Sequence, residues 1–439
     1  MQHSHEALDR EGGFSRANLL IPLRRRDFRV LWTGMTISLI GDGAFLVAMT
    51  WQVYAISNAP SALAMAGIAM TVPTILLLLF GGVVTDRFDR RGVLILADVI
   101  RGVAVAVMAV LSLTGTLELW HVMVLVAFYG AGQAFFGPAF DAIVPNLLPE
   151  SELAQANSLD QLVRPIAFRL VGPALGGWMI AGLGVGTAFA LDAVSFVASV
   201  AAVLAMRAPA VGGAAASSSV IHDIRQGLGF VRANVWLWGT LVSAAIAYLA
   251  FLGPTEVLLP YVVKNDLGGD AGQLGMVFAV GGLGSVIAAF VMGGVGYPRR
   301  SITVIYATWT LATLAVCGYG LATAWWQLMV VSFAFNALET AGTIVWATMK
   351  QRHVPASLLG RVSSLDWLIS IGLLPVSFAL TGPIAGQIGA QATLVAAGLV
   401  GTAATAAALL LPGMRDIERA APVAALEPAA AGDALRHAA

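Results

Sequence analysis

The stretch Gly81-Gly82-Val83-Val84-Thr85-Asp86-Arg87-Phe88-Asp89-Arg90-Arg91 places a short basic loop between two long apolar runs. A weaker copy, Gly293-Gly294-Val295 followed by Arg299-Arg300, lies between two further apolar runs in the second half of the chain. The same kind of loop at the same place in each half indicates an internally duplicated membrane protein.

The composition on either side of this loop is that of a membrane protein. Hydrophobic residues make up 58% of the 439 residues, charged residues only 11%, and there are 48 glycines, whereas about a quarter of a soluble domain is charged. The apolar residues form runs of about twenty, which as helices cross a hydrocarbon core of about 30 Å. We expect twelve spans, at 29–56, 61–83, 92–115, 120–146, 157–183, 187–206, 235–263, 271–294, 301–322, 325–349, 361–386 and 389–412. The strand-length alternation of a β-barrel is not seen, so the fold class is an all-α membrane protein.

The distribution of basic residues predicts the orientation of these spans. With the N-terminus inside, all but four of the 24 Lys and Arg fall in cytoplasmic segments. Arg101, Arg164 and Arg169 lie within spans, and Lys264 lies in an outer loop. By the positive-inside rule both termini are expected in the cytoplasm.

Short repeated sequences divide the chain into two halves. Ser158-Leu159-Asp160 recurs as Ser364-Leu365-Asp366, and Gly172-Pro173 recurs as Gly382-Pro383. Parallel six-span halves are typical of secondary transporters with a site at the bilayer midplane. The expected segments are a cytoplasmic N-terminal segment (1–28), a first six-helix bundle (29–206), a linker with a short amphipathic helix at 221–231 (207–234), a second six-helix bundle (235–412) and a disordered cytoplasmic tail (413–439).

The opening loop is similar to the signature loop of the major facilitator superfamily, G-x-x-x-D-R-x-G-R-K/R. Gly82, Asp86, Arg87, Arg90 and Arg91 fill its positions, and Asp89 stands in place of the usual second glycine. The loop is therefore expected to act as a gate. Asp86 would face the positive N-terminus of a neighbouring span, and Arg90 would pair with an acid such as Asp141. The alternative is a solvated loop that merely obeys the positive-inside rule.

A second resemblance lies in the fifth span, at Gly172-Pro173-Ala174-Leu175-Gly176-Gly177. This segment is similar to the G-P-x-x-G-G antiporter motif of drug:proton exporters in the same superfamily. Glycines allow close helix packing and Pro173 bends the span, although ordinary small-residue packing would leave the same pattern. Residues 20–412 resemble the branch that contains macrolide and tetracycline-type effluxers and enterobactin exporters, which implies the twelve-helix major facilitator fold. The fourth span lacks the Arg that many drug:proton antiporters carry there.

Three ionisable residues near the middle of spans are the candidates for proton coupling. Asp42 lies in span 1, Arg169 in span 5 and Glu339 in span 10. A charge at that depth costs roughly 2.5–3.5 kcal/mol on insertion scales, so such residues normally face inward. We expect Asp42 and Glu339 to carry protons, with Arg169 as their counter-charge. The alternative is a fixed salt bridge between helices.

Other charged residues in or near the spans are assigned structural roles. We expect pairing at Asp98 and Arg101 and at Glu256 near the outer surface, and helix capping at Asp160, Asp192 and Asp366.

Four aromatic residues are candidates for an apolar wall around a substrate. Trp51, Phe136, Phe251 and Trp346 lie on spans 1, 4, 7 and 10. These spans line the cavity in the superfamily that the chain resembles. Packing or lipid-facing positions are the alternative for each of them.

Several other function classes lack their sequence signatures. The two lysines follow Val263 and Met349, so no phosphate-binding Gly-Lys loop exists, and neither Gly-x-Ser-x-Gly nor His-Glu-x-x-His occurs. We therefore expect no enzyme, no cofactor, no metal and no nucleic-acid partner. The single Cys317 is expected to be a packing residue.

The function expected from these features is proton-coupled efflux of small amphipathic molecules such as drugs. The chain would act as a monomer in the cytoplasmic (inner) membrane of a bacterium, with substrate, protons and the lipid bilayer as its partners. Export of an endogenous product such as a siderophore and transport of a lysophospholipid are the alternatives, and a non-transport membrane scaffold is a further one.

Overall fold

A computed structural model of the chain describes residues 20–207 and 220–419, and every regular element in these ranges is helical. Twelve helices or helix pairs among them are long and apolar enough to cross a membrane, which confirms the expected all-α fold class. The single-helix spans are α3 (Arg26–Ile56), α4 (Pro60–Arg87), α5 (Arg90–Leu113), α6 (Leu119–Leu147), α9 (Val185–Ala205), α11 (Val235–Tyr261), α12 (Ala271–Val295), α13 (Ser301–Leu321), α14 (Trp325–His353) and α17 (Ala390–Leu409). The composite spans are α7 (Glu150–Arg164), η2 (Pro165–Val171) and α8 (Gly172–Leu183), and α15 (Ala356–Gly372) with α16 (Leu374–Ile388).

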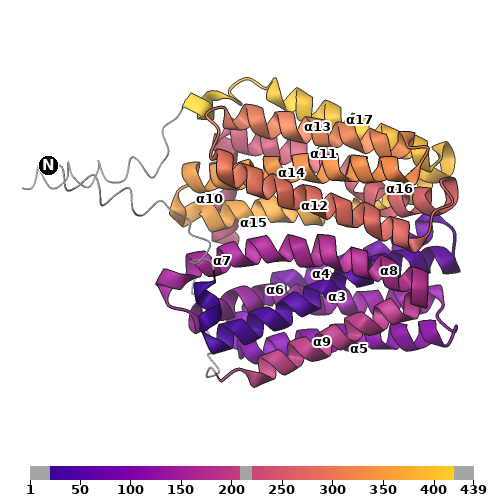
Figure 1. Cartoon of the computed structure of the whole chain (residues 1–439). Helices are drawn as coiled ribbons and strands as arrows, with labels where there is room; N and C mark the ends of the chain where they lie inside the picture. The colour runs from indigo at the N-terminus through magenta and orange to yellow at the C-terminus, as the bar shows by residue number, and fades with distance from the viewer. Residues whose placement is uncertain (1–19, 208–219, 420–439) are drawn as a thin grey trace, which may run out of the picture.

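The helices form two bodies that lie side by side with their axes roughly aligned (Figure 1). In the first half α3 and α5 pack on α9, and α4 packs on α6. In the second half α12 packs on α14, and α13 packs on α17. The halves meet where α8 contacts α12 and where α4 contacts α16.

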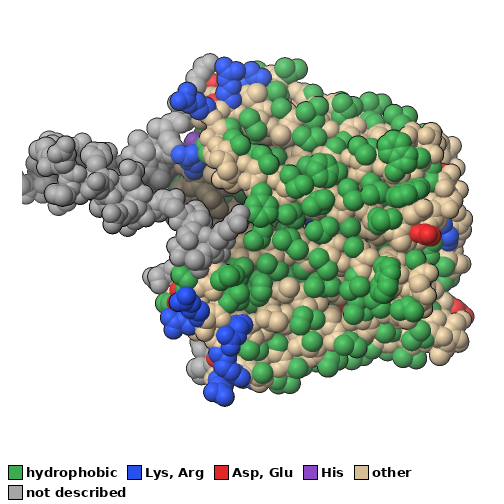
Figure 2. All heavy atoms as spheres, in the orientation of Figure 1, with side chains coloured by type: hydrophobic (Ala, Val, Ile, Leu, Met, Phe, Trp, Pro, Cys, Tyr) green, Lys and Arg blue, Asp and Glu red, His purple; other side chains and the backbone are tan. Residues whose placement is uncertain are grey.

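The two ends of the molecule differ in charge. Lys and Arg side chains gather at the end where α3 begins, while hydrophobic side chains cover the middle of the visible face (Figure 2). We call this the basic end and the opposite one the far end. On α5, Leu96, Val103 and Val110 are each about 60% exposed, and exposure of large apolar side chains along a spanning helix fits a lipid-facing surface.

The fifth span is not a continuous α-helix. Pro165 has no N–H to donate, and from this residue to Val171 the backbone forms the π-helix η2. Arg169 lies in this segment, and π-turns inside α-helices occur often at functional sites.

The start of the C-terminal tail, expected to be disordered from residue 413, instead packs on the second half. Met414 is fully buried against α11, and Glu418, in η4 (Asp416–Arg419), accepts a hydrogen bond of 2.9 Å from the backbone N–H of Thr303. This expectation was wrong because a buried Met and a shared hydrogen bond hold residues 413–419. The expected tail beyond 419, most of the N-terminal segment (1–19) and the glycine- and serine-rich part of the linker (208–219) lie outside the described residues. Helix α10 (Val220–Ala233) covers the expected amphipathic helix and packs on α15.

Candidate transport site: a central cavity and a buried charge cluster

A cavity of about 420 Å³ lies between the two halves. The first half contributes α3, η2 and α8 to its wall, and the second half contributes α11 to α15. Its aromatic lining residues are Phe168, Tyr248, Phe251, Phe278, Tyr319, Phe335 and Trp367, and its charged ones are Arg169, Glu256 and Glu339. The combination of aromatic side chains with a few charged groups suits an amphipathic ligand.

The charged side chains of this cavity are not neutralised by ion pairs with other described residues, so a charged ligand could pair with them. Arg169 donates a hydrogen bond of 3.3 Å to the side-chain oxygen of Asn336, which joins the two halves. Glu339 accepts one of 3.0 Å from Thr343. Within residues 20–207 and 220–419, none of the cavity's three charged side chains forms an ion pair.

Hydrogen bonds join the two halves at the far end of the molecule. The hydroxyl of Tyr54 donates a hydrogen bond of 2.6 Å to the carbonyl oxygen of Val257, and Lys264 donates to the carbonyl oxygen of Tyr54. The side-chain amide of Asn58 donates one of 2.6 Å to Asn265. These bonds tie the end of α3 to the end of α11 and the π-helix η3 (Val262–Asp266) that follows it.

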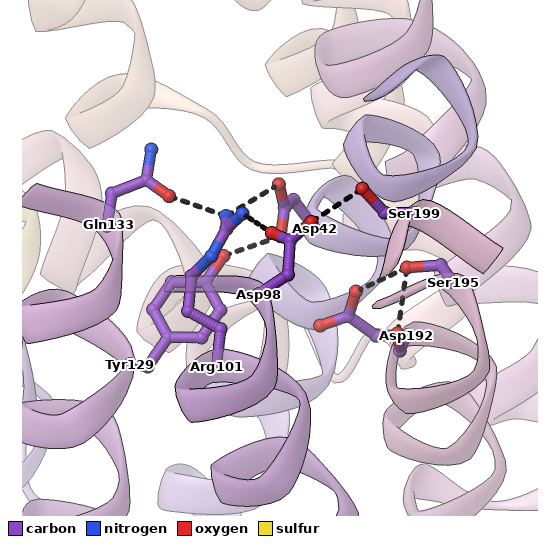
Figure 3. A network of polar contacts seen from close by, with 8 residues as sticks. All are labelled: Asp42, Asp98, Arg101, Tyr129, Gln133, Asp192, Ser195 and Ser199. Atoms are coloured by element: carbon purple, nitrogen blue, oxygen red, sulfur yellow. Dashed lines mark hydrogen bonds and ion pairs between the residues drawn. The ribbon is translucent and has the colours of Figure 1, made fainter. Parts of the chain in front are cut away.

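A second group of charged residues lies inside the first half, and we call it the buried charge cluster (Figure 3). It consists of Asp42 of α3, Asp98 and Arg101 of α5 and Asp192 of α9, with the neutral side chains of Tyr129, Gln133, Ser195 and Ser199 around them.

Arg101 is the centre of this cluster. Its guanidinium group pairs with Asp98, donates a hydrogen bond of 2.7 Å to Gln133 and lies 3.6 Å from Asp42. The rings of Phe136 and Phe196 lie 4.5 and 4.6 Å from its central carbon, at cation–π distance. With 1% of its surface exposed, Arg101 is held entirely by protein groups.

Each of the three carboxyl groups of the cluster lies within hydrogen-bond distance of a hydroxyl group. Tyr129 donates to Asp42 at 2.7 Å, and Ser199 donates to Asp98 at 2.6 Å. The Ser195 hydroxyl lies 2.7 Å from the backbone carbonyl oxygen of Asp192 and 3.1 Å from one of its carboxyl oxygens. None of these carboxyl groups is more than 6% exposed.

The structure separates the three residues predicted for proton coupling. Glu339 and Arg169 line the central cavity, whereas Asp42 pairs with Arg101 in the buried charge cluster. Arg169 is therefore not the counter-charge of Asp42, because the two residues belong to different sites. The predicted pairing of Asp98 with Arg101 is present, whereas Glu256 lines the cavity and has no ionic partner among the described residues.

The predicted helix caps are wrong. Asp192 lies well inside α9 and is completely buried. Asp160 pairs with Arg164 at 2.5 Å. Asp366 pairs with Lys350 and accepts a hydrogen bond of 3.1 Å from Trp346. The spacing of residues does not show these contacts. Asp192 contacts Ser195 one turn later in α9, and Asp366 of α15 contacts Lys350 and Trp346 of α14.

The four aromatic residues predicted for the cavity have different surroundings. Phe251 lines the cavity, with Phe335 packed on it at 5.7 Å between ring centres. Phe136 lies over Arg101, Trp51 lies 5.7 Å from the ammonium group of Lys264, and Trp346 bonds to Asp366. These three are not among the residues that line the cavity. A linear sequence does not show which side of a span faces inward.

The loop between α4 and α5 uses other partners than predicted. Arg90 donates a hydrogen bond of 2.9 Å to the carbonyl oxygen of Ala142, not to Asp141, which lines a separate small cavity with Asp160. Asp89, at the position of the usual glycine, caps α5 by accepting from the backbone N–H groups of Arg91 and Gly92. Arg91 reaches the carbonyl oxygen of Leu204 at 2.7 Å. The side chains at 82, 86 and 87 lie outside what the structure describes.

The glycines of the fifth span are sites of close helix approach. A Cβ atom on Gly172 would lie 2.7 Å from Cα of Gly43, and one on Gly176 would lie 2.6 Å from Cα of Ala44. Gly177 faces the other half, where Cα of Gly275 would lie 2.9 Å from such an atom. The fifth span thus touches α3 on one side and α12 on the other.

A sequence model of the family described as "Transmembrane secretion effector" matches residues 17–431. The chain belongs to this family. It is a transporter of the major facilitator superfamily and not an enzyme, as the resemblance of its loop and fifth span implied.

Two relatives of this major facilitator transporter are named as efflux proteins. Macrolide efflux protein A of Streptococcus pyogenes is 24% identical over 399 residues, which cover 89% of this chain and 96% of that protein. The multidrug efflux pump Tap of Mycolicibacterium fortuitum is 28% identical over 408 residues, with 89% and 97% coverage.

Solved structures share the fold of this transporter at low sequence identity. A bacterial homologue of the iron transporter ferroportin, in an inward-facing state, has a TM-score of 0.66 at 16% identity, covering 88% of this chain and 99% of that one. The nucleoside transporter NupG has a TM-score of 0.66 at 9% identity, with 88% and 98% coverage.

Proposed function

We propose that this transporter exports small amphipathic molecules, including drugs, in exchange for protons and by alternating access of the central cavity. The observation that carries the proposal is a cavity between two duplicated halves. It is lined by aromatic side chains and by three charged residues that form no ion pair with any other described residue. The relatives named as efflux proteins support the direction of transport.

The charges of the cavity favour an amphipathic cation. Glu256 and Glu339 contribute two carboxyl groups against the single guanidinium group of Arg169. An amine on the substrate would lie between the carboxylates, and its apolar body would contact Tyr248, Phe251 and Phe335.

The orientation in the membrane follows from the basic end. Because Lys and Arg are retained on the cytoplasmic side, we infer that the basic end faces the cytoplasm and the far end faces outward. The protein would then lie in the cytoplasmic membrane of a bacterium with both termini inside, and because one chain forms the whole cavity, a monomer would suffice.

The loop at 82–91 is proposed as a gate on the cytoplasmic side. Arg90 and Arg91 already tie this loop to α6 and to the end of α9. We expect Asp86→Asn to insert normally and to lose most of its transport, because the carboxylate would stabilise one access state only. Wild-type flux in a correctly inserted Asp86→Asn protein would remove the gating role.

The proposed coupling uses carboxyl groups that bind a proton in one access state and release it in the other. Glu339 would do so within the cavity, in competition with a cationic substrate, and the buried charge cluster that contains Asp42 would contribute a second carboxyl group.

Transport into inverted membrane vesicles tests the function. The probe is a fluorescent amphipathic cation, and an imposed proton gradient supplies the driving force. Accumulation that collapses with a protonophore supports proton-coupled efflux. Equal dye levels with and without the proton gradient would contradict it, and no flux under any condition would favour a scaffold.

A further inference from the structure

The buried charge cluster contains three carboxyl groups and one guanidinium group. Asp98 and Asp192 are 0% exposed, Asp42 is 6% exposed and Arg101 is 1% exposed. If all three carboxyl groups were ionised, the cluster would carry a net charge of −2 in the interior of the first half. Burying uncompensated charge is so costly that a group normally becomes neutral instead.

Arg101 pairs with Asp98 and with Asp42 but not with Asp192. Asp192 has no ion pair among the described residues. One Asp192 oxygen interacts with Ser195, and the other is buried without any hydrogen-bond partner in the described structure. Leaving a charged buried acceptor unbonded carries the full cost of removing it from water.

The helices packed around Asp192 place two acidic groups and one cation near it. Asp42 of α3 and Asp98 of α5 are negative when paired with Arg101. The hydroxyl of Tyr129 of α6 donates its hydrogen bond to Asp42. Arg101 is the one cation of the cluster, and it is occupied by two other carboxyl groups. A neutral carboxyl group at Asp192 reduces the net charge of the cluster from −2 to −1 and supplies an O–H donor.

A bound metal ion does not fit this cluster as well as a proton does. Within the described ranges no group of three or more His, Cys, Asp or Glu side chains is placed to hold a metal ion. The guanidinium group of Arg101 already fills the centre of the cluster (Figure 3).

We propose that the buried charge cluster is a proton-binding site and that Asp192 is the carboxyl group that carries the proton. The proposal rests on the proposed proton-coupled efflux and adds the site at which the proton is held. The step is a simple exchange, in which a carboxylate and one proton form a carboxylic acid on the outer side and separate again on the cytoplasmic side.

Helix α3 connects this site with the central cavity. A Cβ atom on Gly41 would collide with the side chains of Asp192 and Ser195. One on Gly43 would lie 2.9 Å from Cα of Gly172 in the fifth span. The three residues Gly41-Asp42-Gly43 are thus packed between the proton-carrying α9 and the span that carries Arg169. A charge at Asp192 would repel Asp42, and a shift of α3 would be passed directly to η2 and α8.

Infrared spectroscopy of the purified protein in lipid tests the site without relying on transport. A protonated buried carboxyl group has a C=O stretching band separate from the bands of carboxylates. We expect this band in the wild type at neutral pH, its loss in Asp192→Asn and its retention in Asp160→Asn, a control that removes a carboxyl group outside the cluster. An unchanged band in Asp192→Asn would overturn the proposal.

Two further measurements keep the test decisive. Asp192→Asn resembles the protonated acid, so we expect it to remain folded and to move substrate down its gradient while releasing fewer protons per substrate than the wild type. If this variant fails to fold, Ser195→Ala replaces it, because the missing hydrogen bond should shift the carboxyl band, and an unmoved band would overturn the proposal. If the wild type shows no proton-linked flux, proton-coupled efflux fails, whereas the infrared result still decides where the proton is held.

Discussion

The buried charge cluster and the central cavity place their charged side chains in opposite environments. In the cluster, Arg101 and Asp98 are shielded from solvent and bonded to neighbouring side chains. In the cavity, Arg169 and Glu256 are exposed and have no ionic partner among the described residues. Both sites combine acidic groups with a single arginine, yet protein groups hold one arginine and a ligand can reach the other.

The two environments allow the two sites different functions. A cluster held on all sides by protein groups changes its charge by gaining or losing a proton, and it passes this change on through packed helices. An open cavity can exchange water for substrate, so its charges select the ligand. Substitutions in the cluster should therefore affect stability and coupling, and substitutions in the cavity should affect substrate handling.

The largest expected effect is that of Arg101→Met. The substitution leaves Asp98 and Asp42 buried without a counter-charge, and breaking a buried ion pair in this way costs about 3–5 kcal/mol. Thermal unfolding of the purified protein in lipid measures the loss. Arg164→Met is the matched control, since it removes a half-exposed partner of Asp160 and should cost less than about 1 kcal/mol. Equal losses of stability in both variants would contradict the expected difference between a fully buried ion pair and a partly exposed one.

The next effect belongs to the cavity. We expect Glu339→Gln to lower uphill efflux of a cationic dye by about tenfold, which corresponds to about 1.4 kcal/mol of lost interaction. Its stability should stay within about 0.5 kcal/mol of the wild type, because Glu339 forms no ion pair in the described part of the chain. Glu339→Asp keeps the charge and should retain most of the transport. A large stability loss with normal efflux would assign Glu339 to structure.

A smaller effect is expected where the halves meet. In Gly177→Ala the new Cβ atom would lie 2.8 Å from the carbonyl oxygen of Ala271 and 2.9 Å from Cα of Gly275, both in the other half. The far end should then close less readily, so transport should fall several-fold while each half stays folded. Gly182→Ala, with nothing within 4 Å of the added atom, is the control. Dye transport and thermal stability measured side by side would show whether the contact matters for motion or for folding.

The smallest effect should separate two of the aromatic residues. Trp346→Phe loses the hydrogen bond to Asp366, which is worth about 1 kcal/mol of stability, and should leave the set of exported compounds unchanged. Phe251→Leu, at a buried position, should cost about 1 kcal/mol of stability as well. Unlike Trp346→Phe, it should also change the relative export of substrates of different shape, because Phe251 lines the cavity. Susceptibility profiles of cells that produce each variant give the answer, and identical profile changes in both would contradict the assignment.

The spans and the duplicated halves could be predicted because both are local properties of the chain. A run of about twenty apolar residues has few alternatives to a spanning helix, and the family match agrees with the residues of the loop and the fifth span. The glycines at 172, 176 and 177 were likewise recognised from their spacing. Their contacts with α3 and α12 required the structure.

The partners of the charged residues could not be predicted in the same way. The sequence predicts Arg169 as the counter-charge of Asp42, because both residues lie near the middle of a span. The pairing depends on which side of each helix faces inward, and in the structure Asp42 pairs with Arg101. The position of Asp192 in the sequence predicts a helix cap. In the structure its carboxyl group lies inside a spanning helix, where an ionisable group usually has a functional role.

Apolar length and charge asymmetry act along the chain, so the twelve spans, the two related halves and the basic end can be predicted from the residues, and the motifs add the resemblance to a transporter family. Which charges share a site depends on how the helices pack. Helix rotation and close glycine contacts bring Asp42, Asp98, Arg101 and Asp192 together in one place and leave Arg169, Glu256 and Glu339 around a cavity. The energy of a charge within a membrane depends on its neighbours in space, and these come from helices far apart in the chain.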